Sequence, residues 1–269
     1  MNEEKQPSAK IHILGSCSGP EPFPGRHHTS LAIELPDSLF FLDAGETCSY
    51  TAHLMGLDLL KTRAVFISHC HMDHIGGLPN LLWTIRKLSV VKQKLPVSRV
   101  IHTYLPCLDS YEGMMALLNN TEDGFRCGYG HQAHAVRDGL LWSGEEEAFT
   151  LEAVHNHHLP YTPPAPYLSF SFRIGLAGKS IFYSGDTSLE DLADTVPDYC
   201  DLMFMETGHH QIPQVCRFLK AAGKNIRTLV FIHHGLRVLG DPGRAEEELR
   251  RYWGTDGAIA YDGMTISLQ

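Results

Sequence analysis

The sequence has no run of about 18 consecutive apolar residues, so we expect no membrane-spanning helix. Its first ten residues, MNEEKQPSAK, lack the apolar stretch of a secretory signal. The seven cysteines show no Cys-x-x-Cys pair and no regular spacing, which favours a reducing cytoplasm over a disulfide-stabilised fold. Basic residues are also few, 22 against 31 acidic ones, and the net charge of −9 disfavours a general polyanion-binding surface.

Histidine, by contrast, is abundant, with 17 among 269 residues. These histidines form no terminal tag-like run, and several of them end apolar, strand-like segments. The hydrophobic content of 43% is ordinary for a globular protein, and we expect residues 1–269 to form one domain.

Short β-like runs recur along the chain, with helical patterns between some of them. The expected strands are Lys10–Leu14, Ser30–Leu35, Leu39–Asp43, Arg63–Ser68, Arg99–Thr103, Phe149–Val154, Leu168–Ile174, Ser180–Ser184, Asp201–Glu206, Thr228–His233 and Met264–Leu268, and the expected helices are Gly76–Lys87, Ile212–Ala222 and Gly243–Tyr252. This order predicts an α/β fold, a four-layer αβ/βα sandwich of two mixed β-sheets flanked by helices. Residues 88–144 contain several prolines and glycines, and we expect an irregular excursion there, near the active site.

The run His69-Cys70-His71-Met72-Asp73-His74 directly follows one of the apolar strands. Alternate side chains of an extended segment share a face, so His69, His71 and Asp73 are expected to point together and His74 elsewhere. This geometry divides the ligands between two ions, with His69 and His71 on the first and Asp73 and His74 on the second. Imidazole and carboxylate suit zinc in an open catalytic site, and they also accept manganese or iron. The alternative is a histidine-rich surface loop, which the strand before the run and the glycines after it disfavour.

Two segments around this run, Phe40–Glu46 and Val65–Pro79, resemble the metallo-β-lactamase superfamily. The opening Ile13–Gly19, with Arg26 and Thr29-Ser30 after it, is similar to the branch that contains ribonuclease Z and related small phosphodiesterases. The resemblance extends from about Lys10 to the C-terminus and is weakest over residues 88–144.

The resemblance implies a third histidine ligand for the first ion after a strand midway along the chain. The sequence Leu151-Glu152-Ala153-Val154-His155-Asn156-His157-His158 offers three histidines. The register of the family pattern favours His158, with His155 and His157 as alternatives.

Two more ligands are implied at later strand ends. Asp186, in Tyr183-Ser184-Gly185-Asp186-Thr187, has two oxygens and would bridge both ions. Its ordinary alternative is to cap the segment Ser188–Asp194. His233, with His234 as the alternative, would complete the second ion.

A water that bridges two divalent ions is deprotonated near neutral pH and becomes a nucleophile, so the expected activity is hydrolysis by a dinuclear site with a bridging hydroxide. We expect Asp73 to orient this water and to accept its proton. The His-Glu-Ala-Thr sequence of ribonuclease Z is reduced to Met205–Gly208 here, and His209 or His210, which follow, is expected to assist the leaving group.

Ribonuclease Z also carries a long tRNA-clamping arm between its third histidine and the bridging aspartate, and the interval from His158 to Asp186 is too short for one. The expected substrate is therefore a small or cyclic nucleotide phosphodiester. The alternatives are ribonuclease Z-like RNA processing, lactam or thioester hydrolysis and, outside enzymes, a metal-binding nucleotide sensor. We expect no membrane partner, no preference for nucleic acid, and a second copy of the chain in a homodimer.

Overall fold

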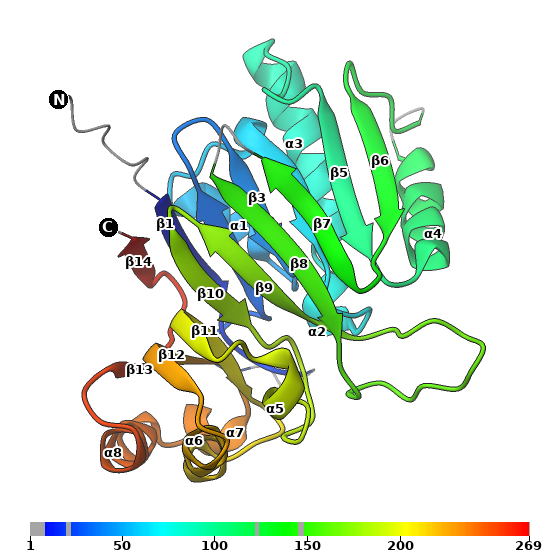
Figure 1. Cartoon of the computed structure of the whole chain (residues 1–269). Helices are drawn as coiled ribbons and strands as arrows, with labels where there is room; N and C mark the ends of the chain where they lie inside the picture. The colour runs from blue at the N-terminus through cyan, green and yellow to red at the C-terminus, as the bar shows by residue number, and fades with distance from the viewer. Residues whose placement is uncertain (1–8, 20–22, 122–123, 145–147, 269) are drawn as a thin grey trace, which may run out of the picture.

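The strands of the protein form two sheets. The computed structural model describes residues 9–19, 23–121, 124–144 and 148–268 (Figure 1). The strands are β1 (Ala9–Gly15), β2 (Ser30–Glu34), β3 (Leu39–Leu42), β4 (Thr62–Phe66), β5 (Val100–Leu105), β6 (Gly130–Ala135), β7 (Gly139–Gly144), β8 (Phe149–His155), β9 (Phe170–Leu176), β10 (Lys179–Tyr183), β11 (Tyr199–Thr207), β12 (Asn225–His234), β13 (Gly257–Ile259) and β14 (Thr265–Leu268). One seven-stranded sheet has the order β14-β1-β2-β3-β4-β5-β6, and the other has the order β13-β12-β11-β10-β9-β8-β7. Both are mixed, because β3 to β6 and β10 to β13 pair in parallel whereas the other neighbours pair antiparallel.

Helices cover the outer faces of the two sheets (Figure 1). They are α1 (Cys48–Leu54), α2 (Met72–Ile75), α3 (Leu78–Lys92), α4 (Leu108–Asn119), α5 (Leu192–Thr195), α6 (Ile212–Ala221), α7 (Leu236–Leu239) and α8 (Pro242–Tyr252), with a 3-10 turn at Leu59–Lys61. Among the described residues no helix combines the length and the apolar character that crossing a membrane requires.

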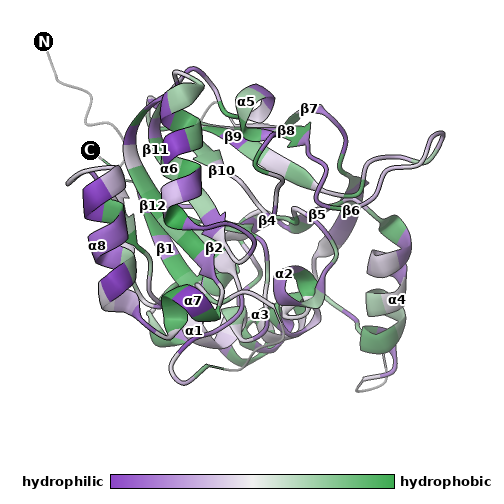
Figure 2. Cartoon of the chain, turned by 90° about the horizontal axis from the view of Figure 1, so that it is seen from below, coloured by the Kyte–Doolittle hydropathy of each residue, from purple (hydrophilic) through white to green (hydrophobic). Residues whose placement is uncertain are grey.

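Three clusters of buried apolar side chains define the layers. The first lies between the two sheets and includes Phe40 of β3 and Phe149 of β8, whose ring centroids are 4.4 Å apart. The second lies between the first sheet and helices α1, α3 and α4, and the third lies between the second sheet and helices α5, α6 and α8. Figure 2 shows the same division, with hydrophobic strands inside and a largely hydrophilic α8 outside. The predicted four-layer sandwich is confirmed.

Helix α3 forms where the sequence predicts a helix, and it continues further than expected, to Lys92. Leu78, Leu81, Leu82 and Ile85 are all fully buried, as their spacing along one helical face requires. The helix ends at Gln93, which takes a left-handed conformation with a φ of 49°.

The expectation of an irregular excursion over residues 88–144 is wrong. This part of the chain contains the end of α3, strands β5, β6 and β7, and helix α4. Pro96, Pro106, Gly124 and Gly128 fall in the connections between these elements, whereas the other glycines of the segment lie within α4, β6 and β7. Strand β6 has no branched or bulky apolar residue, and pairing with β5 supplies its order instead, which local sequence does not reveal. Of the described residues in this segment, none lines the cavity that His71, Asp73 and Asp186 line.

We predict that Leu82→Ala lowers the free energy of unfolding by about 2–5 kcal/mol, because it leaves a void between α3 and the sheet. Val91→Ala on the same helix should change it little, since Val91 is 78% exposed and Leu82 is fully buried. Denaturant unfolding of the two variants beside the wild type measures the difference, and equal losses would contradict the packing of α3.

Candidate metal centre

The candidate ligands come from loops that follow strands of both sheets. The segment after β4 carries His69 to His74, the segment after β8 carries His158, and the segment after β10 carries Asp186. The end of β12 adds His233. Strand ends of the two facing sheets thus meet at one edge of the sandwich, which is how residues 164 positions apart come together.

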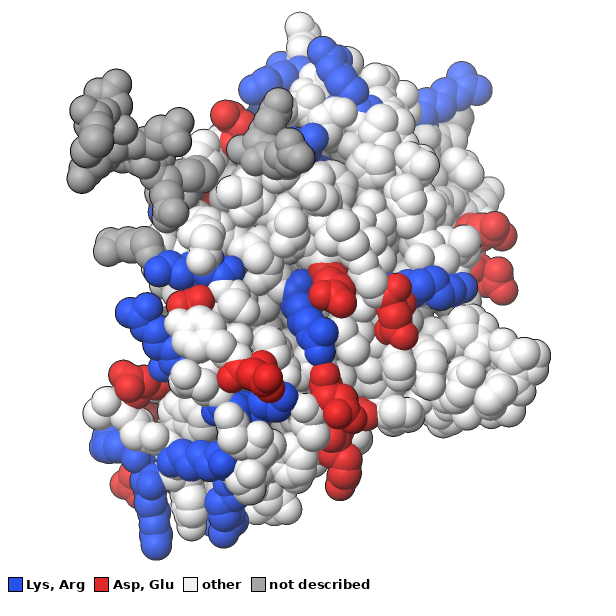
Figure 3. Space-filling view, viewed as in Figure 1, with Lys and Arg blue, Asp and Glu red and all other residues white. Residues whose placement is uncertain are grey.

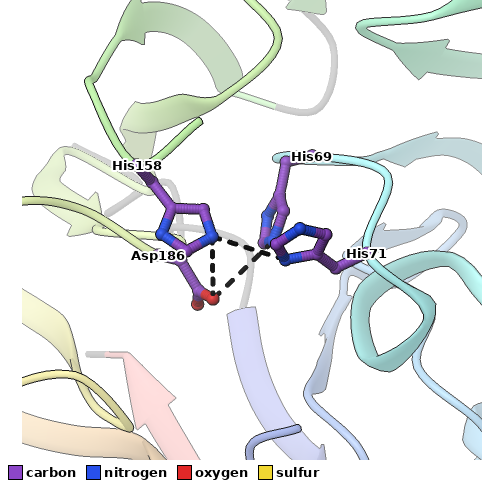
Figure 4. A group of neighbouring side chains, drawn as sticks. All are labelled: His69, His71, His158 and Asp186. Atoms are coloured by element: carbon purple, nitrogen blue, oxygen red, sulfur yellow. Dashed lines mark hydrogen bonds and ion pairs between the residues drawn. The ribbon is translucent and has the colours of Figure 1, made fainter. Parts of the chain in front are cut away.

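The first group consists of His69, His71, His158 and Asp186, each of which offers a ligand atom within 4.8 Å of the others. His158 Nε2 lies 3.4 Å from His71 Nδ1 and 3.6 Å from Asp186 Oδ2. His69 Nε2 lies 3.6 Å from the same oxygen. Figure 4 shows the three imidazoles and the carboxylate pointing toward a common centre. Three nitrogens and one oxygen at these separations suit one divalent ion.

The second group consists of Asp73, His74 and His233. His233 Nε2 lies 3.1 Å from Asp73 Oδ2, and His74 Nε2 lies 3.5 Å from that oxygen. Asp186 also reaches this group, through its other oxygen: Oδ1 lies 3.2 Å from His74 Nε2 and 3.3 Å from His233 Nε2. Asp186 therefore faces the first group with Oδ2 and the second group with Oδ1.

Several buried polar atoms at this point make no hydrogen bond to any residue that the structure describes. They include His69 Nε2, His74 Nε2 and Asp186 Oδ1. A buried polar atom without a partner costs about 1–3 kcal/mol, so three such atoms converging on one place need another partner. Divalent cations would satisfy all three at once, and the donor set therefore fits two metal ions.

The local structure of the motif differs from the extended segment that the sequence analysis assumed. The chain is extended only as far as His71, and Asp73 and His74 lie on the short helix α2. The turn of this helix, rather than strand alternation, separates the direction of Asp73 from that of His71. The four residues nevertheless divide into the expected pairs, His69 with His71 and Asp73 with His74.

Two buried carboxylates hold the imidazoles in place. Asp43 Oδ2 accepts hydrogen bonds from His74 Nδ1 at 2.7 Å and from the hydroxyl of Tyr183 at 2.6 Å. Its Oδ1 accepts the backbone N–H of Ser68 at 2.7 Å. Fixing Nδ1 in this way directs His74 Nε2 toward the metal position.

Glu206, near the end of β11, is the second of these carboxylates, and it lies beside His209 and His233. It is fully buried and accepts hydrogen bonds from the backbone N–H of His209 at 2.8 Å and from His209 Nδ1 at 3.0 Å. Its Oε2 also lies 3.8 Å from His233 Nδ1. Sequence reasoning gave neither Asp43 nor Glu206 this role. Their position at strand ends beside the ligand segments is the signal that was available.

The remaining candidate histidines lie outside the two groups. His155 Nδ1 contacts Asp138 at 2.7 Å, and His157 Nδ1 contacts Asp191 at 2.6 Å, so both anchor the loop that carries His158. His234 is fully buried, and its Nε2 donates to the carbonyl of Ala260 at 2.9 Å. His210 Nε2 donates to the carbonyl of Thr187 at 2.8 Å.

An open cavity of about 370 Å³ lies beside the two groups. Its lining residues are Ser18, Gly19, His28, His71, Met72, Asp73, Asp186, Gly208, His209 and His233. The N-terminal segment therefore contributes Ser18, Gly19 and His28 to the wall of this cavity. Sequence reasoning assigned no role at the site to His28 or to Gly19, although Gly19 ends the segment Ile13–Gly19 that carries part of the family resemblance.

Burial and charge shift the pKa values of the imidazoles in opposite directions. Burial, followed by the neighbouring His74, holds the pKa of His69 well below its usual value. Burial also lowers the pKa of His233, but Asp186 and the other carboxylates outweigh it and raise this pKa to about 9. Burial lowers the pKa of His74 as well, but Asp186 and Asp43 outweigh burial and raise this pKa well above the usual range.

Comparison with known proteins agrees with this geometry. The family model described as anti-Pycsar protein Apyc1 matches residues 9–222. The chain belongs to this family. Ribonuclease Z from Treponema pallidum (strain Nichols) is 47% identical over 70 residues, which make up 26% of this chain and only 22% of that protein.

Solved structures show the fold of this family member. The metallo-β-lactamase fold protein YhfI from Bacillus subtilis superposes with a TM-score of 0.71 at 19% identity, over 97% of this chain and all of that one. The short form of human tRNase Z superposes with a TM-score of 0.68 at 19% identity, over 97% of this chain and 99% of the other. The chain thus has the metallo-β-lactamase fold, as its sequence predicts.

We predict that metal binding releases protons near pH 7.5. The pKa of His233 is raised to about 9, and that of His74 is raised as well, so both imidazoles are protonated without metal and must be neutral with it. Affinity should therefore increase as the pH rises toward about 9. About two protons should leave the imidazoles at pH 7.5, in addition to any proton that a metal-bound water loses. Calorimetric titration with Zn²⁺ in buffers of different ionisation enthalpy counts them. Binding without proton release would contradict the assignment of these two ligands.

Proposed function

We propose that this chain is a metal-dependent hydrolase that cleaves a small or cyclic nucleotide phosphodiester at a dinuclear site. The observation that carries the proposal is the position of Asp186, whose two oxygens face two separate groups of imidazoles. We assign the first ion to His69, His71 and His158, the second ion to Asp73, His74 and His233, and both ions to Asp186.

When bound, two divalent ions, with zinc preferred and manganese or iron as alternatives, would lower the pKa of a water molecule and neutralise charge on the phosphate. Asp73 is the residue we assign to orient that water and take its proton. It lines the cavity, and among the described residues its close contacts, with Gly19, His74 and His233, involve Oδ2. This leaves Oδ1 to face the substrate side.

His209 is the residue we assign to the leaving group. Glu206 holds its Nδ1, which leaves Nε2 for the cavity that His209 lines. The hydrogen bond to Glu206 also raises the pKa of His209, and a protonated imidazole near neutral pH can donate to a departing alkoxide. His210 is less suited, because its Nε2 is directed to the carbonyl of Thr187.

The size and charge of the molecule favour a small substrate. A cavity of about 370 Å³ is at the lower end of the usual range for small-molecule sites, which is roughly 300–1,000 Å³. The interval between His158 and Asp186 holds a loop and the strands β9 and β10, so it is too short for a long arm that clamps RNA. On the face in Figure 3, basic side chains alternate with acidic ones instead of forming a continuous basic surface. The relative named ribonuclease Z supports phosphodiester chemistry.

Ribonuclease Z-like RNA processing is the second candidate, favoured by the 47% identity over 70 residues. Lactam or thioester hydrolysis and a nucleotide-sensing role without turnover complete the alternatives. We also propose that the chain acts in the cytoplasm, because its seven cysteines have neither a Cys-x-x-Cys pair nor a regular spacing. We further propose that it forms a homodimer.

We predict that the wild type binds two metal ions and hydrolyses a cyclic nucleotide, and that Asp73→Asn lowers kcat by at least about a hundredfold. The variant removes a proton acceptor and weakens a ligand while keeping the side chain's volume. Asp198→Asn is the matched control, because the side chain of Asp198 is fully exposed. Elemental analysis and turnover of cyclic nucleotides, RNA, a lactam and a thioester give the readouts. Two bound ions without Asp73-dependent turnover of any of these substrates would favour the sensor.

A further prediction separates His209 from His210. His209→Gln should reduce kcat on a nucleotide with an alkoxide leaving group by about 10²–10⁴-fold, and far less on a p-nitrophenyl phosphodiester, whose leaving group needs no proton. His210→Gln should affect both substrates equally, since it perturbs only packing. The ratio of the two rates for each variant is the measurement, and an unchanged ratio in His209→Gln would exclude His209 as the acid.

A further inference from the structure

One carboxylate outside the two ligand groups organises the N-terminal segment that lines the cavity. Asp262 lies between β13 and β14, beyond the residues that the family model matches, and its side chain is 9% exposed. Its Oδ1 accepts the backbone N–H of Ser16 at 3.0 Å and the hydroxyl of Ser16 at 2.6 Å. Its Oδ2 accepts the backbone N–H of His27 at 2.6 Å. One side chain therefore fastens two points of the N-terminal segment that are 11 residues apart.

Further contacts hold the backbone around Ser16 and His27 together. Arg26 lies 4.0 Å from Asp262 and donates to the Ser16 hydroxyl at 3.2 Å, so the nearly buried carboxylate has a counter-charge. The backbone N–H of Cys17 donates to the carbonyl of His27 at 2.8 Å, which closes the same two strands of chain on each other. The hydrogen bonds that the Asp262 carboxylate accepts from Ser16 and His27 are charge-assisted, and such bonds are among the strongest between a side chain and the backbone.

The fastened segment leads directly to the metal centre. The backbone N–H of Ser18 donates to the carbonyl of His234 at 3.1 Å, and His234 N–H donates back to Ser16 at 2.7 Å. The next residue, Gly19, donates its N–H to Asp73 Oδ2 at 2.7 Å. That oxygen is also the one that lies 3.1 Å from His233 Nε2. The hydrogen bond from Gly19 thus sets the direction of a proposed metal ligand.

We propose that Asp262 is a positioning residue for the second metal ion: by holding Ser16 and His27, it places the Gly19 N–H that orients Asp73. This inference rests on the proposed dinuclear function and adds to it a residue outside the ligand set that affects how tightly the second ion binds. Partners that orient a ligand through a hydrogen bond commonly change metal affinity by about 10–100-fold when they are removed.

Asp262→Asn is the test variant. Asparagine keeps the volume of the side chain, but it must turn an NH₂ group toward either Ser16 or His27, both of which are donors. Asp256→Asn is the matched control, since Asp256 is exposed in the same C-terminal region and makes the same chemical change.

Two measurements are made on the full chain. In the metal-free protein, hydrogen exchange of the Gly19 amide should become about tenfold faster in Asp262→Asn and stay unchanged in Asp256→Asn. In Zn²⁺ titrations against a competing chelator, Asp262→Asn should weaken the binding step that Asp73→Asn also weakens, by about tenfold, and leave the other step unchanged.

Unchanged Gly19 exchange would overturn the proposal. Equal weakening of both binding steps would also overturn it, since Asp262 would then have only a general structural role. The exchange experiment requires neither metal nor turnover. If the wild type lacks activity or binds a single ion, the proposed function fails, while the link from Asp262 to Gly19 is still decided.

Discussion

The arrangement of the site depends on one carboxylate placed between two groups of imidazoles. Asp186 faces the first group with Oδ2 and the second with Oδ1, and it is 2% exposed. Burying so many nitrogens together is unfavourable unless negative charge or a cation compensates for the lost hydration. A single bridging carboxylate does this for both groups and fixes their separation. The two sheets must therefore present their strand ends at the same edge, because Asp186 follows a strand of the second sheet and His69 a strand of the first.

Two further buried carboxylates contact the imidazoles on the ring nitrogens that do not face the proposed metal positions. Asp43 holds His74, and Glu206 lies close to both His209 and His233. Burial tends to raise the pKa of a carboxyl group, yet the hydrogen bond from His209 and the neighbouring imidazole of His233 hold the pKa of Glu206 well below its usual value. Glu206 is therefore ionised, and it supports protonated imidazoles before metal binds and directed neutral ones afterwards. The same interactions that orient the ligands make binding depend on pH.

The sequence was sufficient to predict those parts of the fold and of the candidate site that depend on a local pattern of residues. The run His69–His74 and the strand-end residues Asp186 and His233 lie together as predicted, and the layered fold followed from the order of apolar runs. It was insufficient where long-range pairing decides the outcome. Strand β6 has little intrinsic β-preference and forms by pairing with β5, so residues 88–144 were expected to be irregular. The contact between Asp262 and Ser16 joins residues 246 positions apart, and no spacing rule connects them.

The C-terminal part of the chain has more than a structural role in this arrangement. The family model matches residues 9–222, which include the assigned ligands His69, His71, Asp73, His74, His158 and Asp186. His233 lies beyond that region, and so does Asp262, which fastens the segment that contacts Asp73. Without β12 the second ion would keep Asp73, His74 and one oxygen of Asp186, a weaker set with an additional open position. In the proposed site, residues 223–268 therefore contribute to the second metal position twice, with the ligand His233 from β12 and with Asp262, which holds the segment that contacts Asp73.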